Sequence, residues 1–156
     1  RITLRATAFD AVYRPMIERL GLTDVVELAP ALGHREALRE VMDADGLLLF
    51  QGRTSNPAIP AKAYEYLRAG RPILALVAQD GETAALLQRC GVGDFAPIDD
   101  PRRIEPVLEH FLTNLAGGSL PVLGKDESFQ LSRRHRVAEA AALLDRLVGE
   151  PHEIVA

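Results

Sequence analysis

Short apolar segments alternate with amphipathic segments of helical period along most of this chain of 156 residues. The run at 46–50, GLLLF, is continuously apolar, as in strands that are buried on both faces of a parallel sheet. The segment before it, 34–42, instead places its apolar residues on one helical stripe. Strands that alternate with helices over short connections indicate βαβ units, which form parallel sheets. The sequence therefore predicts an α/β fold with a doubly wound, mostly parallel, Rossmann-like sheet and helices on both faces.

The predicted elements follow from this alternation and from local stop signals such as glycine. Strands are predicted at 2–6, 25–28, 46–50, 72–78 and 94–96. Helices are predicted at 10–20, 34–42, 60–69, 82–90, 101–115 and 132–148, the last capped by Ser132. Asp99 and Asp100 precede a proline and are predicted to cap the helix that starts at 101.

The predicted domain organisation is one Rossmann-like domain with a C-terminal extension. The domain covers 1–116, a glycine- and proline-containing linker covers 117–131, and 132–156 is a helix and tail. We expect this helix to pack on the domain or on a separate N-terminal domain. Because the sequence opens at Arg1 without a methionine, we expect it to be a fragment.

Composition and charge exclude several classes of protein function. The chain is 47% hydrophobic and 26% charged, ordinary values for a globular protein, and its net charge of −4 lacks the basic footprint of a general nucleic-acid binder. Its single cysteine, Cys90, excludes an intramolecular disulfide and fits a reducing cytoplasm. No apolar run approaches the roughly twenty residues of a membrane span. The histidines have no metal-ligand spacing, so no metal site is predicted.

The loop and helix at 51–69 form the candidate site. Ala58 and Ile59 cannot cap a helix, and Pro60 has no amide hydrogen. The amides of Ala61, Lys62 and Ala63 therefore lack an obvious local acceptor. An uncapped helix N-terminus with outward donors is suited to bind an anion.

The side chains around this helix start could bind the phosphate and the ribose of a nucleotide. Lys62 adds a positive charge, and Ser55 and Asn56 can donate to phosphate or sugar oxygens. Glu65 lies on the same helix face as Lys62, where its carboxylate can accept two hydrogen bonds from a vicinal diol. In the alternative interpretation Ser55 or Asn56 caps the helix, and Glu65 pairs with Lys62 or Arg68 as an ordinary surface ion pair.

A larger pattern extends beyond this helix. Ala44-Asp45 precede the apolar strand, and after a variable loop the segment 62–73 reads K-x-x-E-Y-L-x-x-G-x-P-I. This combination resembles the C-terminal half of retaining glycosyltransferases of the glycosyltransferase-B fold, a family that includes sucrose synthases and bacterial capsule and lipopolysaccharide transferases. The resemblance extends over about 2–115.

The resemblance implies a nucleotide-diphosphate sugar as substrate and no metal or other cofactor. Glu65 would hold the ribose hydroxyls, and the backbone at Pro30, Ala31 and Leu32 would contact the base. The diphosphate and the donor sugar would lie against the helix start and the preceding loop, formed by Ser55, Asn56, Pro57, Ala58, Ile59, Ala61 and Lys62. An N-terminal domain would bind the acceptor, a saccharide or a lipid-linked molecule, in the cytoplasm or at the periphery of the inner membrane.

Two features of the family pattern are missing. Pro57 stands where many relatives have a second acidic residue, and the arginine and lysine that clamp the diphosphate have no counterpart. We therefore expect a donor-binding half without turnover of its own, and no catalytic residue is assigned. The alternatives are half of a nucleotide-sugar epimerase, or a non-catalytic Rossmann-like interaction module in which Glu65 and Lys62 form an exposed salt bridge.

Overall fold

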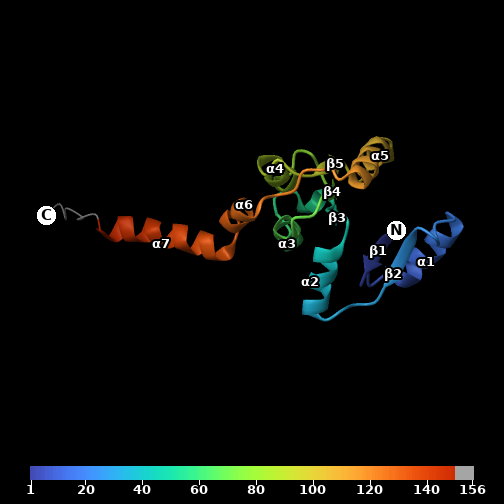
Figure 1. Ribbon diagram of the computed structural model, residues 1–156, viewed down its shortest axis with the longest axis horizontal. Coiled ribbons are helices and arrows are strands. Elements are labelled where there is room, and N and C mark those ends of the chain that lie inside the picture. Colours follow the sequence, from blue (N-terminus) through green and yellow to red (C-terminus); the bar gives the residue numbers. More distant parts are fainter. Residues whose placement is uncertain (150–156) are drawn as a thin grey trace. The chain divides into compact units, whose positions relative to one another are not determined.

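The structure, a computed structural model, describes residues 1–149 and has the predicted α/β class with parallel strands (Figure 1). The strands form two small sheets that belong to two compact units. Unit 1 is Arg1–Glu40 and unit 2 begins at Val41. The domain boundaries predicted from the sequence stay a prediction.

Unit 1 is built around a parallel pair of strands. Strand β1, Ile2–Arg5, pairs with β2, Val26–Ala29, and helix α1, Asp10–Arg19, connects them and packs against β2. Helix α2, His34–Asp43, follows β2 and continues into unit 2. A strand, a helix and a second parallel strand make this a βαβ unit, as the alternation predicts.

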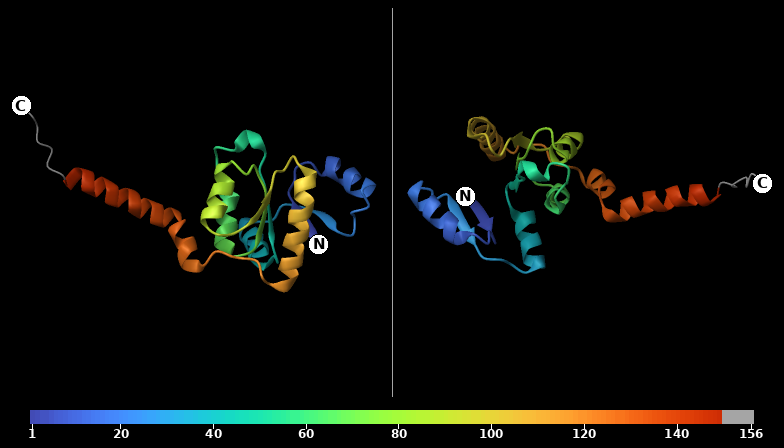
Figure 2. Two further views of the ribbon diagram at one scale, coloured as in Figure 1. Left: turned by 90° about the horizontal axis from the view of Figure 1, so that it is seen from above. Right: turned by 180° about the vertical axis from the view of Figure 1, so that it is seen from behind.

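Unit 2 is a three-stranded parallel sheet of order β3-β4-β5. Its strands are β3 Leu47–Phe50, β4 Ile73–Leu76 and β5 Asp94–Ala96, and its connecting helices are α3 Ala61–Ala69 and α4 Glu82–Arg89, followed by α5 Pro101–Gly117. Figure 2 shows α3 and α4 on one face of the sheet and α5 on the other. The predicted arrangement of helices on both faces is therefore present in this unit.

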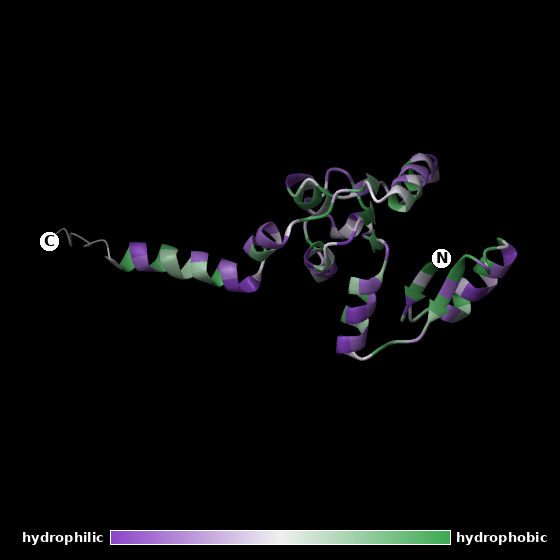
Figure 3. Ribbon diagram, in the orientation of Figure 1, coloured by the Kyte–Doolittle hydropathy of each residue, from purple (hydrophilic) through white to green (hydrophobic). Residues whose placement is uncertain are grey.

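The core of unit 2 lies between the sheet and its helices. On the face of α3 and α4, Leu49 packs with Leu67 and Leu87, which are at most 4% exposed. On the other face the ring of Phe111 from α5 is 3% exposed and lies against the backbone of Gly46. Figure 3 shows the apolar strands in green between helices that carry polar residues on their outer sides. Helices on both faces thus explain the apolar run of β4 and that of β3 as far as Leu49, whereas Phe50, at the end of β3, is 49% exposed and departs from the predicted burial.

Of the predicted caps, those of Asp100 and Ser132 are observed, whereas Asp99 pairs with Arg53 instead. The Asp100 carboxylate accepts a hydrogen bond from the amide of Arg102 at 3.2 Å at the start of α5. The Ser132 hydroxyl accepts one from the amide of His135 at 3.2 Å. Gly70 ends α3 with a φ of 62°, a conformation that glycine adopts without strain.

The segment 117–131, predicted as a linker, contains helix α6, Lys125–Gln130, which was not predicted from the sequence. The Glu127 carboxylate accepts a hydrogen bond from the amide of Gly124 at 3.1 Å, and the preceding Leu123 is 8% exposed within the core of unit 2. Contacts with α3 therefore stabilise a helix too short for a clear apolar period.

Helix α7, Arg133–Gly149, follows α6, contacts it and buries none of its own residues. The predicted packing of this helix on a domain stays a prediction, and the tail at 150–156 lies outside the described residues. Over 1–149, none of the helices combines the length and the apolar character that crossing a bilayer requires.

Candidate functional site

The candidate site lies in unit 2 where the chain leaves the carboxyl end of β3. In open α/β sheets ligands bind at these strand ends. The loop between β3 and α3 contains one 3₁₀ turn, η1, Arg53–Ser55, and then runs through Pro57 to Pro60. Ser55, Pro57 and Ala58 are exposed in it, whereas Asn56 and Ile59 are half-buried.

The start of α3 is uncapped, as predicted. Pro60 is its N-cap residue, with φ −66° and ψ 143°, and no side chain makes a capping hydrogen bond there. The amides of Ala61 and Lys62 donate to no acceptor within the described residues. The amide of Ala63 is different, because it donates to the carbonyl of Pro60 at 2.9 Å, so its predicted availability is wrong. Two outward donors remain.

Capping by Ser55 or Asn56 is also wrong, because these residues make different contacts. The Ser55 amide donates to the Gly52 carbonyl at 3.1 Å, and the Asn56 amide to the Arg53 carbonyl at 3.2 Å. The Asn56 carbonyl accepts a hydrogen bond from the Glu82 amide at 3.1 Å, at the start of α4. The loop is thus tied to α4 and not folded back onto the start of α3.

Lys62 and Glu65 form the ion pair that the alternative interpretation predicts. The Lys62 Nζ lies 3.6 Å from the Glu65 Oε2, and the two side chains are 63% and 41% exposed. Exposed pairs at this helical spacing contribute only about 0.2–0.5 kcal/mol. A ligand could therefore exchange this contact for its own at little energetic cost.

The neighbouring residue Tyr66 holds the inner side of α3. It is half-buried against the core of unit 2. Burial raises the pKa of its phenol, and the charge of Glu65 raises it further. Tyr66 therefore lies on the side of α3 that packs on the core, and Glu65 lies on the side that is open to solvent.

Sequence reasoning missed two side chains at this end of the sheet. Gln51, directly after β3, is 9% exposed and donates two hydrogen bonds within the loop. Arg53 from η1 pairs with Asp99 from the loop after β5, with Nε and Oδ2 3.3 Å apart. The position of Gln51, a polar residue directly after an apolar strand, is a sequence signal that could have identified it. No feature of the sequence near Arg53 or Asp99 predicts that the two residues pair.

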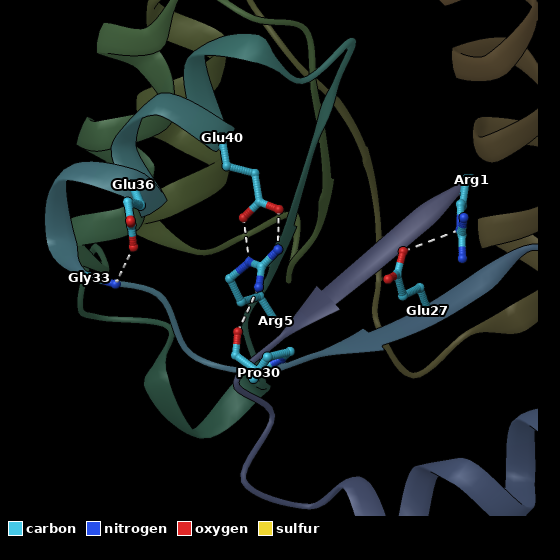
Figure 4. A network of polar contacts seen from close by, with 7 residues as sticks. All are labelled: Arg1, Arg5, Glu27, Pro30, Gly33, Glu36 and Glu40. Carbon is cyan, nitrogen blue, oxygen red and sulfur yellow. Dashed lines mark hydrogen bonds and ion pairs between the residues drawn. The ribbon is translucent and has the colours of Figure 1, made fainter.

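The segment predicted to contact a base lies in unit 1. Pro30, Ala31 and Leu32 follow β2 and are all exposed. The guanidinium of Arg5 donates to the Pro30 carbonyl at 2.6 Å, and its Nε and Nη2 donate to the Glu40 carboxylate (Figure 4). Arg5 thus joins the end of β1 to this segment and to α2.

The same network perturbs both of its charged groups. The hydrogen bond from Arg5 lowers the pKa of the Glu40 carboxyl below its usual value of 4.5, and the hydrogen bond to Glu40 raises the pKa of Arg5. Because the pKa of Glu40 is lower in the folded than in the unfolded chain, its contribution to stability is present above 4.5 and is lost as the pH falls through the lowered value.

We expect wild-type unit 1 to be more stable than the Glu40→Gln variant at pH 7, and the difference to shrink as the pH falls below 4.5. Urea titrations at a series of pH values, followed by NMR resonances of β1 and β2, measure this difference. Glu27→Gln is the control, because Glu27 pairs with the more exposed Arg1, whose Nε lies 3.2 Å from its carboxylate. A difference for Glu40→Gln that does not change with pH would contradict the expectation.

Metal-ligating side chains do not gather in the part of the chain that the structure describes. Across 1–149 no group of three or more His, Cys, Asp or Glu side chains is arranged to hold an ion.

Comparison with known proteins found no family model, no curated protein and no solved structure with significant similarity to this chain.

Proposed function

We propose that this chain is the donor-binding half of a glycosyltransferase, which holds a nucleotide-diphosphate sugar. The observation that carries the proposal is the start of α3 at the carboxyl end of a parallel sheet, with the unpaired amides of Ala61 and Lys62 and no capping side chain. Anions bind at such positions because the amides and the helix dipole both favour negative charge.

The diphosphate, the ribose and the sugar each have a counterpart in the residues around this start. The amides of Ala61 and Lys62 and the Lys62 ammonium would hold the diphosphate. Glu65, one turn further along the exposed side, would accept two hydrogen bonds from the ribose diol. Residues Ser55 to Ile59 would contact the phosphate or the sugar, as the family resemblance implies.

The reaction is transfer of the sugar to an acceptor hydroxyl. The acceptor oxygen bonds to the anomeric carbon, the bond from that carbon to the diphosphate oxygen breaks, and the acceptor proton passes to the departing nucleoside diphosphate. Positive groups and oriented amides lower the energy of this step because negative charge grows on the leaving group. The proposal assigns no metal to the chain. It places the chain in the cytoplasm, peripheral to the inner membrane where the acceptor is lipid-linked.

A titration with UDP, GDP and ADP tests the proposal. We expect one diphosphate to stabilise the chain against heat, by about 2.7 kcal/mol at a ligand concentration one hundred times Kd. Glu65→Ala is expected to lose most of this effect because the ribose diol loses its acceptor. Glu105→Ala, which removes an exposed glutamate of α5, is the matched control and should behave as wild type. Equal stabilisation of the Glu65→Ala variant would contradict the role of this residue.

A second candidate is a non-catalytic interaction module, and the exposed Lys62–Glu65 ion pair favours it. In that case none of the three nucleotides should stabilise the chain, and Lys62→Ala and Glu65→Ala should each change its stability by less than about 0.5 kcal/mol. The same titration therefore separates the two candidates.

A further inference from the structure

We infer that Gln51 is a positioning residue, which fixes the loop between β3 and α3 in the form that receives the ligand. The inference rests on the proposed function for its ligand. Gln51 follows the last residue of β3, and its backbone amide donates to the carbonyl of Leu76 at 3.0 Å, which continues the pairing of the sheet. Its side chain, 9% exposed, is therefore held under the loop by a rigid element.

The side-chain amide of Gln51 satisfies two loop carbonyls at once. Its Nε2 lies 2.7 Å from the carbonyl oxygen of Ser55 and 2.7 Å from that of Ala58. A neutral amide nitrogen carries two hydrogens, so both bonds are made by one group with no donor left over. The Asn56 carbonyl, between them in sequence, is taken by the Glu82 amide. Three carbonyls of one short loop are thereby directed at protein donors.

This arrangement matters for an anionic ligand because carbonyl oxygens repel phosphate oxygens. With the Ser55, Asn56 and Ala58 carbonyls occupied by protein donors, the loop leads into α3 with the amides of Ala61 and Lys62 still unpaired. A site whose donors are already arranged binds its ligand more tightly than a site whose loop must reorganise on binding. Gln51 touches no ligand atom and acts only through the loop.

Two substitutions separate hydrogen bonding from packing. Gln51→Met keeps an unbranched side chain of similar length and removes both donors. Gln51→Glu keeps the shape and places a carboxylate, which can only accept, beside two carbonyls. If Gln51 acts by filling space, both variants bind nucleotide as wild type does. If it acts through its two hydrogen bonds, Gln51→Met is weakened and Gln51→Glu is weakened more.

The experiment uses the full chain, the two variants and the control Gln88→Met, which changes an exposed glutamine of α4. Affinities for UDP, GDP and ADP are measured under conditions where circular dichroism shows every variant folded. Amide hydrogen exchange at Ser55, Asn56 and Ala58, whose amides are hydrogen-bonded within the loop, is measured without ligand. We expect about a tenfold loss of affinity in Gln51→Met, a larger loss in Gln51→Glu, and faster exchange in both.

The outcomes are distinct for the two proposals. Wild-type affinity in Gln51→Met, when wild type itself binds a nucleotide, overturns the positioning role and leaves the proposed function intact. If wild type binds none of the three nucleotides, the proposed function fails. The exchange measurement alone then decides whether Gln51 holds the loop. Faster exchange in that case supports its hold on the loop, and exchange equal to that of Gln88→Met overturns it.

Discussion

Leu67→Ala is expected to lower the free energy of unfolding of unit 2 by about 2–5 kcal/mol, the range for truncating a buried leucine. Leu67 is 2% exposed and joins α3 to a core cluster that includes Leu49, Ile73 and Leu87. The substitution removes apolar surface that stabilises α3 and leaves a cavity that its neighbours cannot fill completely. Since whole domains are stable by only about 5–15 kcal/mol, this is a large part of the total.

Chemical denaturation followed by circular dichroism and by NMR resonances of β3 and β4 measures the change. Arg68→Ala is the matched control, because the next residue of the same helix is exposed. It should change stability by less than about 0.5 kcal/mol, as is usual for surface substitutions. A similar small effect for Leu67→Ala would mean that α3 is not held by this contact.

The position of α3 also decides the geometry of the candidate site. Lys62 and Glu65 lie on its exposed side, while Leu67 and Ala63 lie on its buried side. A helix that shifts at Leu67 moves its uncapped start relative to the loop held by Gln51. We therefore expect any nucleotide affinity of folded Leu67→Ala to fall together with its stability.

Local signals explain why most element boundaries could be predicted from the sequence. The helix predicted at 60–69 is observed as Ala61–Ala69, because a proline starts it and Gly70, in its left-handed conformation, ends it. Its missing cap could be predicted in the same way, since capping depends on a few adjacent residues. Helix α6 could not, because its stability comes from packing of the neighbouring Leu123 and from α3.

Features that depend on distant residues were not predictable. The pattern of apolar runs predicts parallel strands but does not specify which strands pair, and the five strands observed within 1–149 form sheets of two and three. The same holds for the site. The role of Gln51 depends on the path of the loop that returns to it, and the Arg53–Asp99 pair joins residues that follow different strands.

Gly46→Val is expected to destabilise unit 2 by about 1–3 kcal/mol, because the added side chain overpacks the contact between β3 and α5. A Cβ atom at Gly46 would lie 2.9 Å from Cζ of Phe111 and 3.4 Å from Cδ1 of Leu115. Phe111 is 3% exposed, so its ring has little room to move aside. The effect is one of space alone, since the backbone of Gly46 is not in the left-handed region.

A double-mutant cycle with Phe111→Leu tests this reason directly. The smaller side chain opens space beside position 46, so the two substitutions together should destabilise less than the sum of their separate effects. Gly52→Val is the matched control, because a Cβ there meets no atom within 4 Å and its φ is −71°. Equal effects of valine at Gly46 and Gly52, or additive effects of Gly46→Val and Phe111→Leu, would show that α5 does not pack closely on the start of β3. Close packing there would instead make Gly46 the position that sets how near α5 approaches the sheet.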